Sequence, residues 1–128
     1  MNNQLVNYVD TFVPDNLINS AFPRALTTGV LVRANQGVLL RGAVLSLCLE
    51  TEEMVLLGTA AGDEETLTPN CILADPVDTG DAGAVPAVAY RTGHFNRPAL
   101  IVKSGYTMTL ADEEILRNAG ILLSDALV

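Results

Sequence analysis

Residues 68–100 read TPNCILADPVDTGDAGAVPAVAYRTGHFNRPAL, and this stretch decides the fold. It holds two short apolar runs, at residues 71–74 and 84–90, separated by an acidic connection that contains glycine. A polar segment follows at residues 91–98, before a third apolar run at residues 99–102. Short β-prone runs separated by glycine-bearing turns are typical of β-hairpins. The stretch therefore predicts strand, loop, strand, tight turn and strand, in that order.

The composition favours one β-rich domain. Of the 128 residues, 49% are hydrophobic and 17% are charged, which is enough apolar material for a packed core. Tryptophan is absent and aromatic residues make up 5%, so aliphatic side chains must fill the interior. Short aliphatic runs of this kind fit a β-rich core. We find no internal repeat and no linker that would define a second domain.

The charge balance excludes several partners. Fifteen acidic residues against seven basic ones give a net charge of −8, which repels nucleic-acid phosphates and anionic membranes. The longest apolar runs, at residues 43–49 and 84–90, are far shorter than the roughly 20 residues that cross a bilayer. The first residues also lack the pattern of a signal peptide. We expect synthesis in a cytoplasm, with no direct contact to nucleic acid or membrane.

Strand patterns begin at residue 29. Residues 29–33 predict a short strand, and a long apolar run at residues 38–50 predicts another, with Gly42 as a bulge or bend. Residues 54–57 predict the returning strand. Alternation beyond Gly42 predicts an inner and a mixed face. Leu45, Leu47 and Leu49 would lie on one face, and Val44, Ser46, Cys48 and Glu50 on the other.

One α-helix is predicted near the end of the sequence. Thr109 can cap it, Asp112 can close a capping box, and Gly120 can end it. Its buried stripe would consist of Leu110, Ile115, Leu116 and Ala119. Residues 121–123 then predict a last strand.

Residues 1–28 differ from the remainder of the sequence. Lys and Arg are missing before Arg24, and Pro14 and Pro23 interrupt the segment. Pro14 would stop a helix even though the apolar spacing before it is nearly helical. We therefore predict an irregular or extended arm. Its aromatic and aliphatic side chains would either fold back onto their own domain or dock on another chain.

Candidate catalytic residues are few. His94 is the only histidine, and its spacing offers it no acid–base partner. Cys48 and Cys71 stand in strand-like apolar surroundings that favour buried reduced thiols, with a disulfide or a reactive thiol as the alternatives. Arg91 and Arg97 would be solvated or pair with carboxylates of a neighbour. Phosphate-binding glycine patterns and calcium-loop spacings are absent. We therefore expect no catalytic site, no metal and no cofactor.

Three parts of the sequence closely resemble the head decoration proteins of tailed bacteriophages, the family of lambda decoration protein D. They are residues 71–78, residues 90–96 and residues 116–123. The family-motif turn would include Tyr90, Gly93 and Phe95. The N-terminal segment is also similar to the arm of many members, and the resemblance implies that this arm binds the capsid. The arm residues concerned are Phe12, Val13, Pro14, Asp15, Asn16, Leu17, Ile18, Phe22 and Pro23.

The resemblance implies a mainly β, tulip-like or barrel-like domain at residues 29–128, with a capsid-binding arm at residues 1–28. It further implies homotrimers bound to the major capsid protein on the outer surface of the virion. Seated at three-fold and quasi-three-fold positions of the expanded head, they would resist the pressure of packaged DNA. One alternative is a small trimeric β-module that binds a host-surface glycan or a tail component, although the lack of tryptophan counts against sugar binding. A cysteine-dependent enzyme is another.

Overall fold

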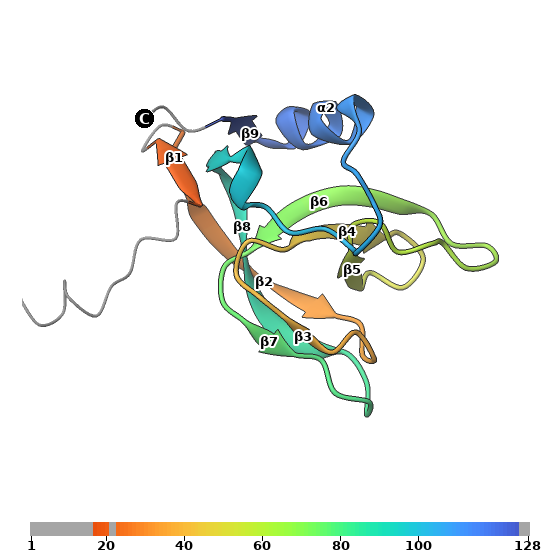
Figure 1. Ribbon diagram of the computed structural model, residues 1–128. Helices are drawn as coiled ribbons and strands as arrows, with labels where there is room; N and C mark the ends of the chain where they lie inside the picture. The colour runs from red at the N-terminus through yellow and green to blue at the C-terminus, as the bar shows by residue number, and fades with distance from the viewer. Residues whose placement is uncertain (1–16, 21–22, 126–128) are drawn as a thin grey trace, which may run out of the picture.

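The computed structural model describes residues 17–20 and 23–125, which form a mainly β fold with one α-helix in this part of the chain (Figure 1). This confirms the predicted fold class. The elements are β1 (Ile18–Ser20), β2 (Leu26–Val32), β3 (Val38–Leu39), β4 (Val44–Cys48), β5 (Met54–Leu56), β6 (Leu67–Leu73), β7 (Val77–Asp78), β8 (Val85–Asn96), the 3-10 helix η1 (Arg97–Ala99), α2 (Leu110–Ala119) and β9 (Ile121–Ser124).

Strands β2, β5, β4, β6 and β8 close into a five-stranded barrel. The first part of β8 pairs with β2 in antiparallel register, and Tyr90 and Ala89 pair with β6 to complete the wall. Aliphatic side chains fill the interior, as the lack of tryptophan requires. Fully buried members of this core include Val32, Val44, Leu45, Ile72, Leu73 and Ala89.

The second part of β8 leaves the barrel and forms a small sheet with β1 and β9 (Figure 1). The predicted tight turn at residues 91–98 is therefore wrong, because β8 continues to Asn96 and the chain reverses only at η1. Gly93 allows this course, since its φ of 151° is unfavourable for other residues. A Cβ at Gly93 would also lie 2.7 Å from Cζ of Phe95. The glycine is required for a bend within a strand and for close packing of a ring.

The predicted strand at residues 38–50 is divided in two. Gly42, with φ of 98°, bends the chain between β3, which pairs with β7 in a separate ribbon, and β4, which enters the barrel. The bend at Gly42 is thus confirmed. The face prediction is wrong, because Cys48 is buried while Leu49 is 53% exposed. A register shift between Leu45 and Ser46 interrupts the alternation on which that prediction depended.

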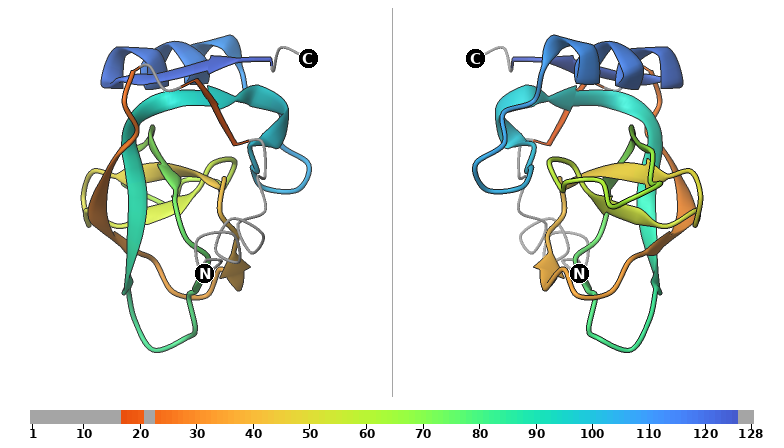
Figure 2. Two further views of the ribbon diagram at one scale, coloured as in Figure 1. Left: turned by 90° about the vertical axis from the view of Figure 1, so that its left-hand side faces the viewer. Right: turned by 90° about the vertical axis from the view of Figure 1, so that its right-hand side faces the viewer.

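Helix α2 begins and ends where the sequence predicts. Thr109 and Asp112 form the capping box, and Gly120 takes the left-handed conformation that ends the helix. The predicted buried stripe is wrong except for Leu116, and Leu110 is 74% exposed. The reason is that α2 lies beside β9 at one end of the barrel and turns only a narrow face inward (Figure 2).

The packed structure starts before residue 29. Leu17 belongs to the hydrophobic core, β1 follows it directly, and β2 begins at Leu26. The predicted end of the arm at residue 28 therefore lies inside β2. Residues 1–16, 21–22 and 126–128 lie outside the described residues.

Candidate functional site

The chain enters and leaves the described fold at the same end of β8. Asn96 donates its backbone N–H to the carbonyl oxygen of Leu17 at 2.7 Å, and Ile18 pairs with Phe95. On the opposite side of β8, Ser124 of β9 pairs with Asn96. β1 runs antiparallel to β8 whereas β9 runs parallel to it, so the start of β1 and the end of β9 lie at the same end of β8, on opposite sides of that strand. We call this place, formed by residues 17–18, 95–98 and 123–125, the terminal pole.

Arg97 holds the terminal pole together. Its guanidinium donates to both carboxylate oxygens of Glu113, at 3.0 and 3.1 Å, and to Asp125 at 3.0 Å. It also donates to the backbone oxygen of Leu123 at 3.4 Å. Bidentate pairing of this kind fixes the orientation of the guanidinium as well as neutralising its charge. The hydrogen bonds to Glu113 also raise the pKa of Arg97. Arg97 thereby joins η1, α2 and β9, and its carboxylate partners come from its own chain.

The residues of the predicted family motif form internal packing. The rings of Tyr90 and Phe95 lie 5.4 Å apart and are tilted by 52°. The hydroxyl of Tyr90 accepts a hydrogen bond of 2.6 Å from Arg41, whose guanidinium also lies over the ring. Phe95 is fully buried against Gly93. The motif thus ties the bend at Gly42 to β8, and its side chains stabilise the strand from which the terminal pole projects.

Only three of the predicted arm residues are described. Leu17 is a core residue, Ile18 is exposed on β1, and Pro23 is half-buried between β1 and β2. The remaining members, Phe12, Val13, Pro14, Asp15, Asn16 and Phe22, lie outside the described residues. Sequence reasoning missed the core position of Leu17, since a leucine that packs and a leucine that docks have the same signature in an extended segment.

His94 does not take part in an acid–base arrangement with the cysteines. Its Nε2 lies 2.7 Å from the hydroxyl oxygen of Ser124, which links β8 to β9. Cys48 and Cys71 are both free and buried, as the sequence predicts, and burial raises the pKa of the Cys71 thiol to about 12. Hydrogen bonding with Thr51 lowers the pKa of Cys48. Neither thiol is accessible to a substrate in this fold.

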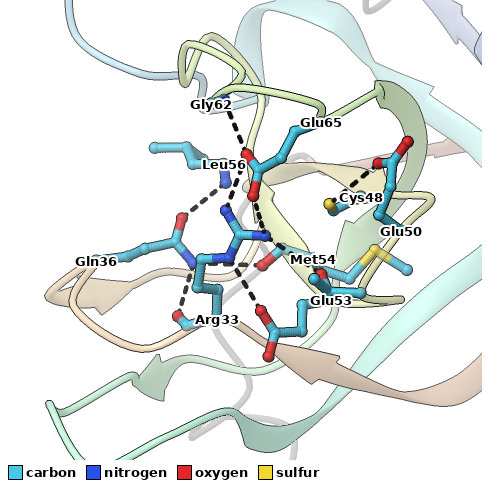
Figure 3. A network of polar contacts seen from close by, with 10 residues as sticks. Arg33, Gln36, Cys48, Glu50, Glu53, Met54, Leu56, Gly62 and Glu65 are labelled. Carbon is cyan, nitrogen blue, oxygen red and sulfur yellow. Dashed lines mark hydrogen bonds and ion pairs between the residues drawn. The ribbon is translucent and has the colours of Figure 1, made fainter.

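A second concentration of charge surrounds Arg33, at the end of β2. Figure 3 shows its guanidinium between the carboxylates of Glu53 and Glu65, at 2.9 and 3.1 Å. Glu65 also accepts a hydrogen bond from the backbone of Gly62, and that bond is the main reason why its pKa is lowered. Gln36 donates to the carbonyl oxygen of Arg33 and accepts from the backbone N–H of Leu56. Since two carboxylates already neutralise the arginine, this network fastens a loop and does not form an anion site.

Metal and membrane features are not found in the described structure. Within residues 17–20 and 23–125, no three His, Cys, Asp or Glu side chains gather closely enough to hold a metal ion. No helix in the same ranges is long and apolar enough to cross a membrane. The terminal pole is the candidate site, because the chain enters and leaves the described fold there.

Comparison with known proteins identifies the family of the chain. The family model described as bacteriophage lambda head decoration protein D matches residues 8–121. The match covers most of the chain, so the chain belongs to this family of structural phage head proteins, which are not a class of enzymes. This confirms the resemblance seen in the sequence and places the protein on the phage capsid. A search of curated proteins finds no match.

Proposed function

We propose that the protein binds the outside of the expanded phage head as a homotrimer and stabilises the head against the pressure of packaged DNA. Its partner would be the major capsid protein, at three-fold and quasi-three-fold positions. Membership of the decoration family supports this proposal. The structural observation that carries it is the terminal pole, where Leu17 fixes the start of the folded part at the end of β8 that also holds the end of β9.

The proposed attachment is mechanical. Residues 1–16 would span at most about 55 Å if fully extended, so the three arms of one trimer could contact different capsid subunits. Contacts that are weak one by one then combine through effective concentration into tight attachment. The arm contains Phe12 and Val13 among its apolar residues, and apolar side chains on an extended segment suit strand addition to a sheet edge of the capsid protein.

Deleting residues 1–16 tests the role of the arm. Leu17 and β1 stay in place, so we expect an unchanged circular dichroism spectrum and an unchanged oligomeric state. We also expect loss of binding to expanded heads, measured by co-sedimentation. A deletion of residues 1–23 would be less informative, because it removes a core residue and a strand.

The matched control carries the same sixteen residues in scrambled order. It keeps arm length and composition, and we expect it to bind as poorly as the deletion if specific side chains make the contact. Unexpanded heads form the second comparison, and the proposal expects binding only after expansion. A truncated protein that still saturates expanded heads would remove the arm from the mechanism.

A further inference from the structure

An apolar groove of about 700 Å³ runs along the side of the barrel, away from the terminal pole. Its position follows from incomplete strand pairing. β2 pairs with β8 along its length, yet it pairs with β5 only through Val32 and Met54. In the described structure, no strand lies beside the edge of β2 that precedes Val32. We call this the β2 groove, lined chiefly by Gly29, Leu31, Leu47, Leu49, Met54 and Pro86.

The β2 groove exposes apolar surface that a soluble barrel would ordinarily cover. Leu31 is 49% exposed, and Leu49 is exposed to a similar extent. Pro86 lies opposite Leu31 in the ladder and has no backbone N–H to donate. A Cβ built on Gly29 would meet nothing within 4 Å. An open strand edge next to exposed leucines invites association, so natural proteins protect such an edge or use it.

The charges on the rim of the groove are complementary to each other. Arg91 lies near the start of β2, whose first residues pair with Thr92 and Tyr90, and Glu52 lies in the turn before β5, near the end of β2. β2 has seven residues, so Arg91 and Glu52 lie near opposite ends of a strand about 20 Å long. Neither Arg91 nor Glu52 has an ion-pair partner among the described side chains. The groove therefore presents an unpaired cation at one end and an unpaired anion at the other.

We infer that the β2 groove is the contact between copies in the homotrimer, an inference that rests on the proposed function. Three copies around a three-fold axis would turn their grooves inward, so that Leu31, Leu49 and Pro86 pack together near the axis. Arg91 of one copy would meet Glu52 of the next. A cyclic trimer repeats the same head-to-tail contact at each interface. One cation and one anion at opposite ends of the groove therefore form an ion pair at all three interfaces.

The balanced charge of the groove rim allows a second copy to be the occupant. Each chain carries a net charge of −8, so copies repel one another over most of their surface. The rim of the β2 groove is balanced, with one charge of each sign. Copies can therefore approach on this face without the repulsion that acidic loops elsewhere would cause.

The first test is Gly29→Glu. The position is open and its backbone is ordinary for a strand, so the monomer fold accommodates the side chain. A carboxylate in the middle of the groove would oppose association. We expect the variant to sediment as a monomer at a concentration where the wild type is a trimer, with an unchanged circular dichroism spectrum. Leu110→Glu is the control, since it adds the same charge on α2, outside the groove, and should remain trimeric.

The second test exchanges the rim charges. Arg91→Glu and Glu52→Arg should each raise the dissociation constant of the trimer, by about tenfold, because a like-charge contact replaces an ion pair at every interface. The double variant should restore most of the wild-type affinity. Losses that simply multiply in the double variant would contradict the pairing of Arg91 with Glu52.

The outcomes separate this inference from the proposed function. A Gly29→Glu protein that stays trimeric overturns the inference alone, and if it also fails to bind expanded heads, the groove receives the capsid protein instead. Loss of the trimer in Leu110→Glu would place the contact on α2 and also overturn the inference. A wild-type protein that is monomeric would overturn the homotrimer itself. Deleting residues 1–16 tests capsid binding independently of these three measurements of oligomeric state.

Discussion

Leu17 is the residue at which the arm becomes part of the fold, and its replacement tests that boundary. Its side chain is 1% exposed, and a Cβ placed on Gly42 would lie 3.5 Å from its Cδ1. The next residue, Ile18, belongs to the same strand region but is 40% exposed. Leu17→Ala and Ile18→Ala are therefore a matched pair that differs mainly in burial.

The expected difference is large enough to measure. Truncating a buried leucine to alanine costs about 2–5 kcal/mol, because transfer free energy is lost and a cavity remains. For a domain of this size each kcal/mol lowers the melting temperature by about 4 °C, so Leu17→Ala should lose about 8–20 °C. Ile18→Ala removes a side chain that water already reaches, and it should cost roughly 1 kcal/mol.

Urea unfolding followed by far-ultraviolet circular dichroism gives the free energies without requiring tryptophan. All variants must be compared at one protein concentration, because association of copies raises the apparent stability. Capsid binding of both variants is then measured under conditions in which both are folded. If Leu17→Ala is no more destabilising than Ile18→Ala, residue 17 belongs to the arm and not to the folded domain.

Three further predictions use the same purified protein. Gly93 and Gly83 have φ values of 151° and 154°, but only a Cβ at Gly93 would strike a ring atom, at 2.7 Å. Gly93→Ala should therefore be at least about 2 kcal/mol more destabilising than Gly83→Ala in the urea assay, and equal losses would contradict the packing argument. The hydrogen bond from Gly62 lowers the pKa of Glu65, so its contribution is complete above about pH 4.5 and is lost as the pH falls through the lowered value. Glu65→Gln should make the acid decline of stability shallower, and an unchanged decline would show that the carboxylate is not involved. Cys71, whose pKa burial raises to about 12, should react with iodoacetamide at pH 8 about a thousandfold more slowly than in unfolded protein, and rapid labelling would show that the barrel opens.

Local signals in the sequence were reliable guides to α2. A helix cap depends on residues that are neighbours in the chain, and Thr109, Asp112 and Gly120 each do in the structure what the sequence predicts. The bend at Gly42 is of the same kind, because a φ of 98° favours glycine whatever surrounds the residue. The mainly β class follows from many such short signals together.

Burial could not be predicted in the same way, because it depends on distant partners. Leu110 and Leu116 have the same chemistry and lie on one helix, yet only Leu116 faces the core. Arg97 could be taken for a solvated side chain because Glu113 and Asp125 lie 16 and 28 positions away. The terminal pole could not be predicted from the sequence for the same reason, since it forms only when β1 and β9 flank β8.

Strand β8 connects the terminal pole, proposed for attachment to the head, with the β2 groove, proposed for contact between copies. Its end carries the terminal pole between β1 and β9, and its first part borders the β2 groove through Pro86. In a cyclic trimer equivalent points lie at one height along the axis, so all three arms would leave the same face of the assembly. A load applied to one arm would then pass through the hydrogen bonds of β1 to β8, and from β8 and β2 across the groove to the neighbouring copies. Because the terminal pole and the β2 groove lie toward different ends of β8, attachment to the head and contact between copies would not compete for the same surface.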